Sequence, residues 1–274
     1  MIIGVNGKIG SGKDTVGKIA QCLMNHPKIS NKDLLWMIEN NVVAEHTKCE
    51  IKKFAGKLKQ IASLLTGVPV EKFEDQEFKK QEMPEEWWYK NVYDAGWDKK
   101  WTKETINYPT HTSTESHIVK TTYRQFLQNL GTEAMRDGLH TNVWVNALFA
   151  DYKTNAEWFD EIRGNYKEYP NWIITDMRFP NEMEAVKERD GITIRVVRYP
   201  KTVEVSRGPE NVETIPFDPT NHKHMSLWKG DSSRLHPSET ALDGAEFDYE
   251  IINDGTIEDL IEKVREILIN EKLL

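Results

Sequence analysis

The feature that most constrains this chain is a glycine-rich segment near its start, which lies between two different apolar patterns. An apolar run at residues 2–5 comes directly before residues 7–13, whose letters GKIGSGK fit the spacing G-x-x-x-x-G-K. From Val16 onward, apolar residues recur at helical spacing. These patterns predict a strand, a loop and a helix in immediate succession. In that arrangement, backbone N–H groups at the N-terminus of the helix can surround a phosphate group.

Such a loop holds phosphate through main-chain atoms, so glycine is needed where a side chain would keep the backbone away from the anion. At roughly 7% usage for each fixed residue, the bare pattern occurs by chance in about one chain in ten of this length. Its place between a strand and a helix makes the interpretation specific. Lys13 is expected to bridge the β and γ phosphates of ATP. The other ATP contacts expected from this loop are Gly10, Ser11, Gly12, Asp14 and Thr15.

Asp14 stands after the lysine, where Ser or Thr is usual, and Thr15 comes one residue later. A carboxylate beside a phosphate loop costs repulsion unless it pairs with a cation or faces away from the loop. Its alternative role is to favour the dipole at the start of the helix. Nucleoside monophosphate kinases similarly carry their threonine two residues after the lysine, so residues 12–15 resemble their loop more than that of GTPases or motor ATPases.

The rest of the chain alternates between strand and helix patterns. Apolar runs predict strands at residues 50–54, 172–175, 192–197 and 247–252. Helical patterns begin near residues 55, 123, 144, 180 and 256. Thr256 and Asp259 approximate a capping box. Because each parallel return needs a crossover, the alternation predicts an α/β fold with a mainly parallel sheet flanked by helices. We expect residues 1–274 to form a single domain around it.

Two segments depart from this alternation. Residues 70–120 combine dense charge with four tryptophans between positions 87 and 101, which predicts an insertion rather than core. Its open roles are a self-packed surface, packing on the nucleotide site, a homodimer contact and attachment to a partner. Residues 200–240 contain five prolines, so we expect an irregular loop. This loop is either an ordinary surface loop or a lid that expels water, with Arg207 and Arg234 as its cations.

A second group of charged residues is suited to an acceptor substrate. Asp176 ends an apolar strand, where a carboxylate can lie near Mg²⁺ or face the second substrate. Arg178 follows near the start of the next helix, and a surface ion pair with Asp176 is the alternative role for it. Further cations that could clamp an acceptor phosphate are Lys57, Lys59, Arg124 and Arg136.

Several of these motifs together resemble one family. The segments that carry the resemblance are 7–15, 54–59, Arg124 with 130–133, 144–146, 175–182 and 253–256. They resemble the bacteriophage deoxynucleoside monophosphate kinase family in the same order from end to end, and the block D-x-R-F-P-N-E at 176–182 is the most specific of them. The resemblance covers most of the chain apart from the regions near 70–120 and 200–240. It implies a P-loop NTPase fold with a nucleotide-binding insertion and a lid, and ATP-dependent phosphorylation of deoxynucleoside monophosphates.

The resemblance also implies roles for individual residues. Lys13, Arg124 and Arg178 would be catalytic, and Asn253 with Gly255 would lie near the adenine of ATP. Thr15 and Asp176 would hold Mg²⁺, directly or through water. The expected contacts to the deoxynucleotide are Lys57, Arg124, Arg136, Trp144, Asp176, Arg178 and Glu182. Trp144 could stack on a base, and because an aromatic face favours all bases almost equally, base choice is not readable from it.

Charge and hydropathy exclude other classes of function. The chain has 36 Lys and Arg against 44 Asp and Glu, a formal net charge of −8, and an acidic chain repels the backbone of duplex nucleic acid. No window approaches the ~18 uninterrupted apolar residues of a membrane span. The first residues lack the pattern of a signal peptide, so we expect a cytoplasmic protein, in the host cytoplasm if a phage encodes it. Cys22 and Cys49 fit no metal spacing.

Two other functions fit the same loop. The chain could be another small-molecule P-loop kinase, such as one that acts on dephospho-coenzyme A. It could also be a regulatory module whose loop senses ATP without catalysis. Competition between acceptors separates the first from a deoxynucleotide kinase, and turnover separates the second.

Overall fold

The computed structural model describes residues 1–40, 42, 48–94, 100–105, 115–154, 156–160, 164–206, 212–229 and 236–274. These residues form two compact units. The first unit consists of Met1–Phe54 and Val145–Leu274, and the second of Ala55–Trp144. Among the described residues, no helix has the length and apolar character needed to cross a membrane.

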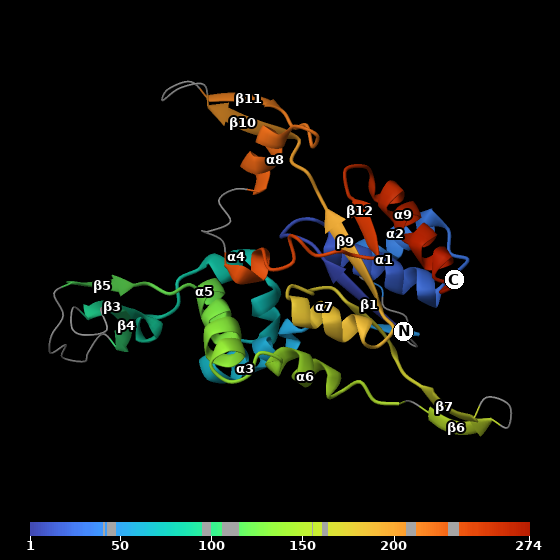
Figure 1. Cartoon of the computed structure of the whole chain (residues 1–274), viewed down its shortest axis with the longest axis horizontal. Helices are drawn as coiled ribbons and strands as arrows, with labels where there is room; N and C mark the ends of the chain where they lie inside the picture. The colour runs from blue at the N-terminus through green and yellow to red at the C-terminus, as the bar shows by residue number, and fades with distance from the viewer. Residues whose placement is uncertain are drawn as a thin grey trace. The chain divides into compact units, whose positions relative to one another are not determined.

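A five-stranded sheet forms the centre of the first unit (Figure 1). Its strands are β1 (Ile2–Asn6), β2 (Cys49–Lys52), β8 (Asn171–Ile174), β9 (Ile192–Val197) and β12 (Tyr249–Ile252). They lie in the order β12-β9-β1-β8-β2, and every neighbouring pair is parallel. The predicted α/β fold with a parallel sheet is therefore confirmed. β1 lies between β8 and β9, so these two strands pair with opposite edges of β1.

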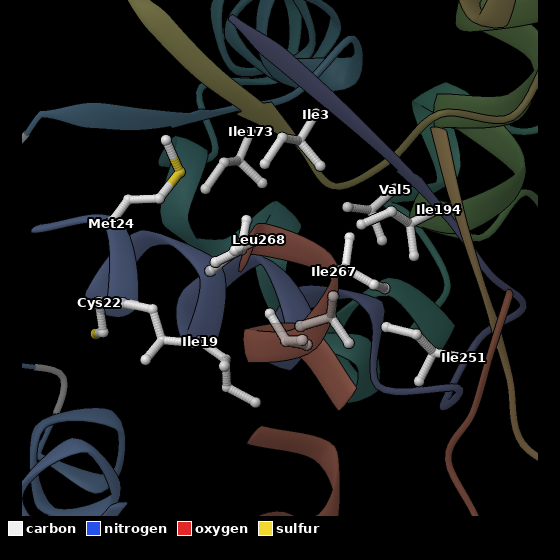
Figure 2. Packing of buried hydrophobic residues seen from close by; sticks show 14 of the residues in the cluster. Ile3, Val5, Ile19, Cys22, Met24, Ile173, Ile194, Ile251, Ile267 and Leu268 are labelled. Carbon is white, nitrogen blue, oxygen red and sulfur yellow. The ribbon is translucent and has the colours of Figure 1, made fainter. Parts of the chain in front are cut away.

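Helices cover both faces of this sheet. Ile3 and Val5 of β1 point toward α1 (Lys13–Asn25) and α9 (Ile257–Asn270) in one buried apolar cluster (Figure 2). The residue between them, Gly4, faces Met177 and Val186 of the segment that contains α7 (Pro180–Lys187). Because successive strand residues point to opposite faces, α7 lies opposite α1 and α9. A further helix, α2 (Asn31–Glu39), packs on α1.

The last helix forms where its sequence pattern predicts. The Thr256 hydroxyl accepts from the backbone N–H of Asp259, and the Asp259 carboxylate accepts from the backbone N–H of Thr256, which confirms the predicted capping box. Leu260, Ile261 and Val264 are buried along one face of α9. The aspartate in place of the usual glutamate therefore does not prevent the cap from forming.

The 200–240 segment differs from its prediction. Where described, it contains a hairpin of β10 (Thr202–Ser206) and β11 (Val212–Pro216), then α8 (His222–Lys229) and the 3₁₀ helix η5 (Pro237–Glu239). The expectation of an irregular loop is therefore wrong for these residues. Val203 and Val205 are buried on one side of β10 in the alternation of a strand. Pro200 precedes this strand and Pro216 ends the other, so neither interrupts the hairpin.

The second unit combines helices with a small antiparallel sheet. Its elements are α3 (Ala55–Thr66), η1 (Val70–Glu74), α4 (Gln76–Lys80), η2 (Glu85–Trp87), β3 (Tyr89–Asp94), β4 (Lys100–Thr105), β5 (Glu115–Val119), α5 (Tyr123–Gln128) and the π-helix η3 (Asn129–Asp137). Its core contains Ala62 and Tyr123 together with Phe73 and Met83. Part of the 70–120 segment therefore packs in the core of this unit.

The remaining elements are α6 (Val143–Phe149) and an antiparallel hairpin of β6 (Ala156–Asp160) and β7 (Gly164–Glu168). The hairpin falls between two of the predicted core elements, at residues for which we predicted no strand. It forms a two-stranded sheet of its own and adds no strand to the five-stranded sheet.

Candidate functional site

The glycine-rich loop has a backbone that only glycine adopts easily. It joins the end of β1 at Asn6 to the start of α1 at Lys13. Gly10 has a φ of 79° and Gly12 a φ of 96°, both in the left-handed region. The Ser11 N–H donates to the Lys8 carbonyl at 3.1 Å, which closes the turn. A Cβ at Gly7 would collide with Ser11 Oγ and lie 2.8 Å from the Val196 carbonyl oxygen.

The predicted Asn253 lies against this loop. Its Nδ2 donates to the Ser11 carbonyl at 2.8 Å, and its backbone N–H donates to the Val197 carbonyl at 2.7 Å. Asn253 therefore connects the loop to the carboxyl ends of β9 and β12. The Ser11 side chain is 3% exposed, and its hydroxyl has no hydrogen-bond partner among the described residues. A buried hydroxyl without a partner is unfavourable by itself and is available to a ligand.

Alanine substitutions at Gly10 and Gly12 distinguish the effect of backbone strain from the effect of a steric clash. Gly12→Ala is expected to lower the free energy of unfolding by about 1–2 kcal/mol through left-handed strain alone. It should do further damage because its Cβ would lie 2.5 Å from Asn253 Nδ2. Gly10→Ala has open space around its Cβ, so it should show the strain only. The measurements are urea unfolding and ATP affinity.

The control is Gly56→Ala in α3, where a Cβ would meet nothing within 4 Å. Alanine is the better helix former, so this variant should be as stable as the wild type or more stable by up to about 1 kcal/mol. If Gly12→Ala unfolds at the same urea concentration as this control, the loop is not constrained as described.

Asp14 pairs with a cation, as its position beside the loop requires. Its Oδ1 lies 3.3 Å from Lys53 Nζ and accepts from the Thr175 hydroxyl at 3.0 Å. Partial burial acts to raise the pKa of Asp14, but Lys53, Lys13 and the Thr175 hydroxyl together lower it below its usual value. The carboxylate therefore stays ionised at neutral pH. It ties the first turn of α1 to the end of β8.

Lys13 shares its surroundings with the charged residues that follow β8. Its half-buried position lowers the pKa of its ammonium group, as does the positive charge of Arg178. The carboxylates of Asp14, Glu239 and Asp176 act in the opposite direction, and the net effect is a lowered pKa. Such Coulomb effects weaken with distance. The predicted donor-side cation and two of the predicted acceptor-side residues therefore lie in one charged cluster.

Asp176 and Glu182 also have structural roles at the carboxyl end of β8. Asp176 Oδ1 accepts from the backbone N–H of Phe54 at 2.8 Å, just before α3 begins. Glu182 is 3% exposed, and its Oε2 accepts from the backbone N–H groups of Arg178 at 2.7 Å and Phe179 at 3.1 Å. Glu182 thus fixes the entry into α7 and the backbone of Arg178. The predicted contacts of Asp176 and Glu182 with a deoxynucleotide stay predictions.

The Arg178 side chain binds a segment that sequence reasoning did not connect with it. Its Nη1 donates to Glu239 Oε1 at 2.8 Å and to Ser238 Oγ at 3.3 Å. Both acceptors belong to η5. Glu239 lies 61 residues further along the chain, and no local sequence pattern links it to Arg178.

A cleft of about 940 Å³ opens beside the loop within the first unit. It is lined by the loop itself and by the residues that follow β9 and β12, including Arg198, Tyr199, Lys201, Asn253 and Gly255. Its volume suits a nucleotide-sized ligand. In parallel α/β sheets, ligands bind outside the carboxyl ends of the strands where the chain crosses to opposite sides of one strand. β1 is such a strand here.

The residues predicted to hold Mg²⁺ could bind that ion only together with phosphate oxygens and water. Thr15 is half-buried in the first turn of α1, and its hydroxyl has no partner among the described residues. In the part of the chain that the structure describes, no group of three His, Cys, Asp or Glu side chains could hold a metal ion. Mg²⁺ commonly binds through one or two protein oxygens, several waters and phosphate oxygens. The Thr15 hydroxyl and the Asp176 carboxylate fit that requirement.

The other predicted acceptor residues belong to the second unit. Arg124 Nη2 donates to Gln76 Oε1 at 2.8 Å, and Arg136 is 8% exposed in the π-helix. Trp144 is 6% exposed, and its indole N–H donates to the Gly131 carbonyl at 2.8 Å. A base could stack on this ring only after the ring is uncovered. Lys57 is half-buried in α3.

The two predicted lid residues, Arg207 and Arg234, lie outside the described residues. The hairpin and the helix η5 that flank these positions are described, and η5 supplies the partners of Arg178. Of the described part of the 200–240 segment, η5 therefore contacts Arg178, while Lys201 lines the cleft beside the loop.

No protein-family model matches the sequence, and no curated protein matches it.

Proposed function

We propose that this protein is an ATP-dependent kinase that converts deoxynucleoside 5′-monophosphates to diphosphates. The observation that carries the proposal is the charged cluster around the glycine-rich loop, in which Lys13 lies within electrostatic reach of Asp176 and Arg178. The succession of strand β1, glycine-rich loop and helix α1 supports the P-loop on which the proposal depends. The resemblance to bacteriophage deoxynucleoside monophosphate kinases includes the residues of this cluster, and the preference for deoxynucleotides rests on that resemblance.

The charges of the cluster suit transfer between two anions. The second pKa of a phosphate monoester is about 6, so an acceptor phosphate is largely dianionic at neutral pH and needs no general base. The barrier is then the repulsion between donor and acceptor. Lys13 would bind the triphosphate, and Arg178 would bind the acceptor phosphate or the transferring group. Mg²⁺, when bound through Thr15 and Asp176, supplies positive charge to the donor phosphates.

The cleft beside the loop would hold the rest of the donor. Asn253 and Gly255 line the cleft and flank the loop, which suits the predicted position of adenine near them. The cleft has Arg198 and Lys201 on the side of β9. The contacts of Arg124, Lys57 and Arg136 with the acceptor phosphate stay predictions.

The test is turnover by the purified protein. It is mixed with ATP, Mg²⁺ and each of the four deoxynucleoside monophosphates, and diphosphates are separated by ion-exchange chromatography. We expect diphosphate from at least one of the four. AMP, GMP and dephospho-coenzyme A are tested in parallel. Preferred phosphorylation of dephospho-coenzyme A would identify a different kinase, and ATP binding without any product would identify a nucleotide sensor. Either result would refute the proposal.

A further inference from the structure

One nitrogen of the Arg178 guanidinium, Nη1, is held by a single short helix, η5. Nη1 donates both to Glu239 Oε1 and to Ser238 Oγ. The Arg178 side chain is 37% exposed, whereas that of Glu239 is 19% exposed. A charge-assisted hydrogen bond to a shielded carboxylate is stronger and better oriented than an exposed ion pair. The contact therefore restricts the orientation of the guanidinium plane.

Ser238 is itself oriented by His236. In the tautomer that leaves His236 Nδ1 unprotonated, this nitrogen accepts from the backbone N–H of Ser238 at 3.2 Å. The Ser238 hydroxyl, 2.8 Å from the same nitrogen, then donates its hydrogen to Nδ1. A lone pair of Ser238 Oγ is left to accept from Arg178. The three residues form a directed chain of hydrogen bonds that ends on Nη1.

The opposite edge of the guanidinium is available. Within the described ranges, Nε and Nη2 of Arg178 have no hydrogen-bond partner. These two nitrogens form one of the edges through which arginine binds two phosphate oxygens at once. Arg178, Ser238 and Glu239 line a small cavity together with Asn6, Gly7 and Lys8, so the guanidinium lies beside the start of the glycine-rich loop.

We propose that Glu239, assisted by Ser238, is a positioning residue that holds Arg178 by Nη1 and so presents its Nε and Nη2 to the acceptor phosphate. This inference rests on the proposed kinase function. Glu239 contacts only one nitrogen of the guanidinium, and it does not occupy the edge that a phosphate needs. It therefore orients the arginine without competing with the substrate. Its negative charge, close to Lys13 as well, would also disfavour phosphate binding at the wrong edge of Arg178.

The test is the kinetics of Glu239→Ala and Glu239→Gln. Misplacing a substrate-binding group by about 1 Å can cost 10²-fold, so Glu239→Ala should lower kcat/KM for the monophosphate by about 10- to 100-fold. KM for ATP should stay within about twofold, because the loop does not need Arg178 to hold the donor. Glu239→Gln keeps an acceptor of the same shape without the charge, so its loss should be smaller. Ser238→Ala provides a second variant should Glu239→Ala fail to fold.

The matched control is Glu262→Gln on α9, which also removes a glutamate next to an arginine. Glu262 Oε1 lies 3.7 Å from Arg265 Nε and is 59% exposed. Its kinetics should equal those of the wild type. If the wild type phosphorylates a monophosphate and Glu239→Ala keeps its kcat/KM, the positioning role is refuted while the kinase proposal stands. A rise in monophosphate affinity in Glu239→Ala would also overturn it, because Glu239 would then compete with the substrate. A wild type without turnover refutes the kinase proposal itself.

Discussion

Lys13→Ala is expected to lower kcat by about 10³-fold or more, the scale on which a cation at a transferring phosphoryl group acts. Lys13 is the first residue of α1 and follows two left-handed glycines, so its side chain starts at the point where the loop can surround a phosphate. Among the described lysines near the loop, Lys53 pairs with Asp14, and Lys8 lies 3.8 Å from Asp243. The measurement is diphosphate formation under saturating ATP and monophosphate.

The same substitution should leave the fold intact. Burial lowers the pKa of Lys13, which means that its charged form is disfavoured in the folded protein relative to the unfolded chain. A lowered pKa in the folded protein means that the positive charge of Lys13 opposes folding at neutral pH. Removing it should therefore maintain or raise Tm, and alanine is also the better helix former. An enzyme that loses turnover while it keeps or gains stability has lost a functional group.

Lys18→Ala is the control for this experiment, because Lys18 is exposed on the same helix. It should retain turnover and ATP binding. If Lys13→Ala keeps kcat within about tenfold of this control, Lys13 does not stabilise the transferring phosphoryl group. If the wild type binds ATP without forming product, and Lys13→Ala loses ATP binding, the loop belongs to a nucleotide sensor and not to a kinase.

The central sheet was predictable because its signals are local. The alternation of apolar runs with helical spacing requires parallel strands whatever the distant contacts are, and all five strands of the sheet correspond to predicted runs or overlap them. The loop was predictable for the same reason: its glycines, its strand and its helix lie within 25 residues. The capping box of α9 likewise depends on only two residues, Thr256 and Asp259.

The partners of the charged residues could not be predicted in the same way. Asp14 was expected to need a cation, but that this cation is Lys53 follows from the pairing of β2 beside β8. The contact between Arg178 and Glu239 joins segments 61 residues apart, and no pattern in either segment indicates the other. Trp144 shows that residue type alone does not establish a role in binding. A tryptophan suits base stacking, yet this one is buried with its N–H bonded to Gly131.

The 200–240 segment shows how a correct observation led to a wrong prediction. Prolines do interrupt regular structure, but Pro200 precedes β10, Pro216 ends β11 and Pro237 opens η5, and proline is tolerated at such positions. Pro237 opens η5, and its fixed φ suits the first position of a helix. The alternation of apolar and polar residues in 202–206 was the better indication of the local structure than the number of prolines. The same helix carries Ser238 and Glu239 to Arg178, so this error concealed part of the candidate site.

Arg178→Ala is expected to lower kcat/KM for the monophosphate by about 10³-fold, the lower end of what a phosphate-binding arginine supplies. ATP binding should change little, because the loop and Lys13 remain. The matched control is Arg189→Ala, two residues after the end of α7, whose Nη1 donates to the Ala185 carbonyl at 2.7 Å. That arginine stacks on Phe149 at 4.0 Å and has a packing role, so its loss should affect stability more than turnover.

A double variant distinguishes the role of Arg178 from that of Glu239. Arg178→Ala alone leaves the shielded Glu239 carboxylate without its cation, which should lower Tm. Adding Glu239→Ala removes that charge and should restore part of the loss. Turnover should behave differently. If Glu239 acts only through Arg178, the double variant should be as slow as Arg178→Ala alone, since a positioning residue has no effect once the group it positions is gone. Multiplied losses in the double variant would instead mean that Glu239 acts on the reaction by a route that does not include Arg178.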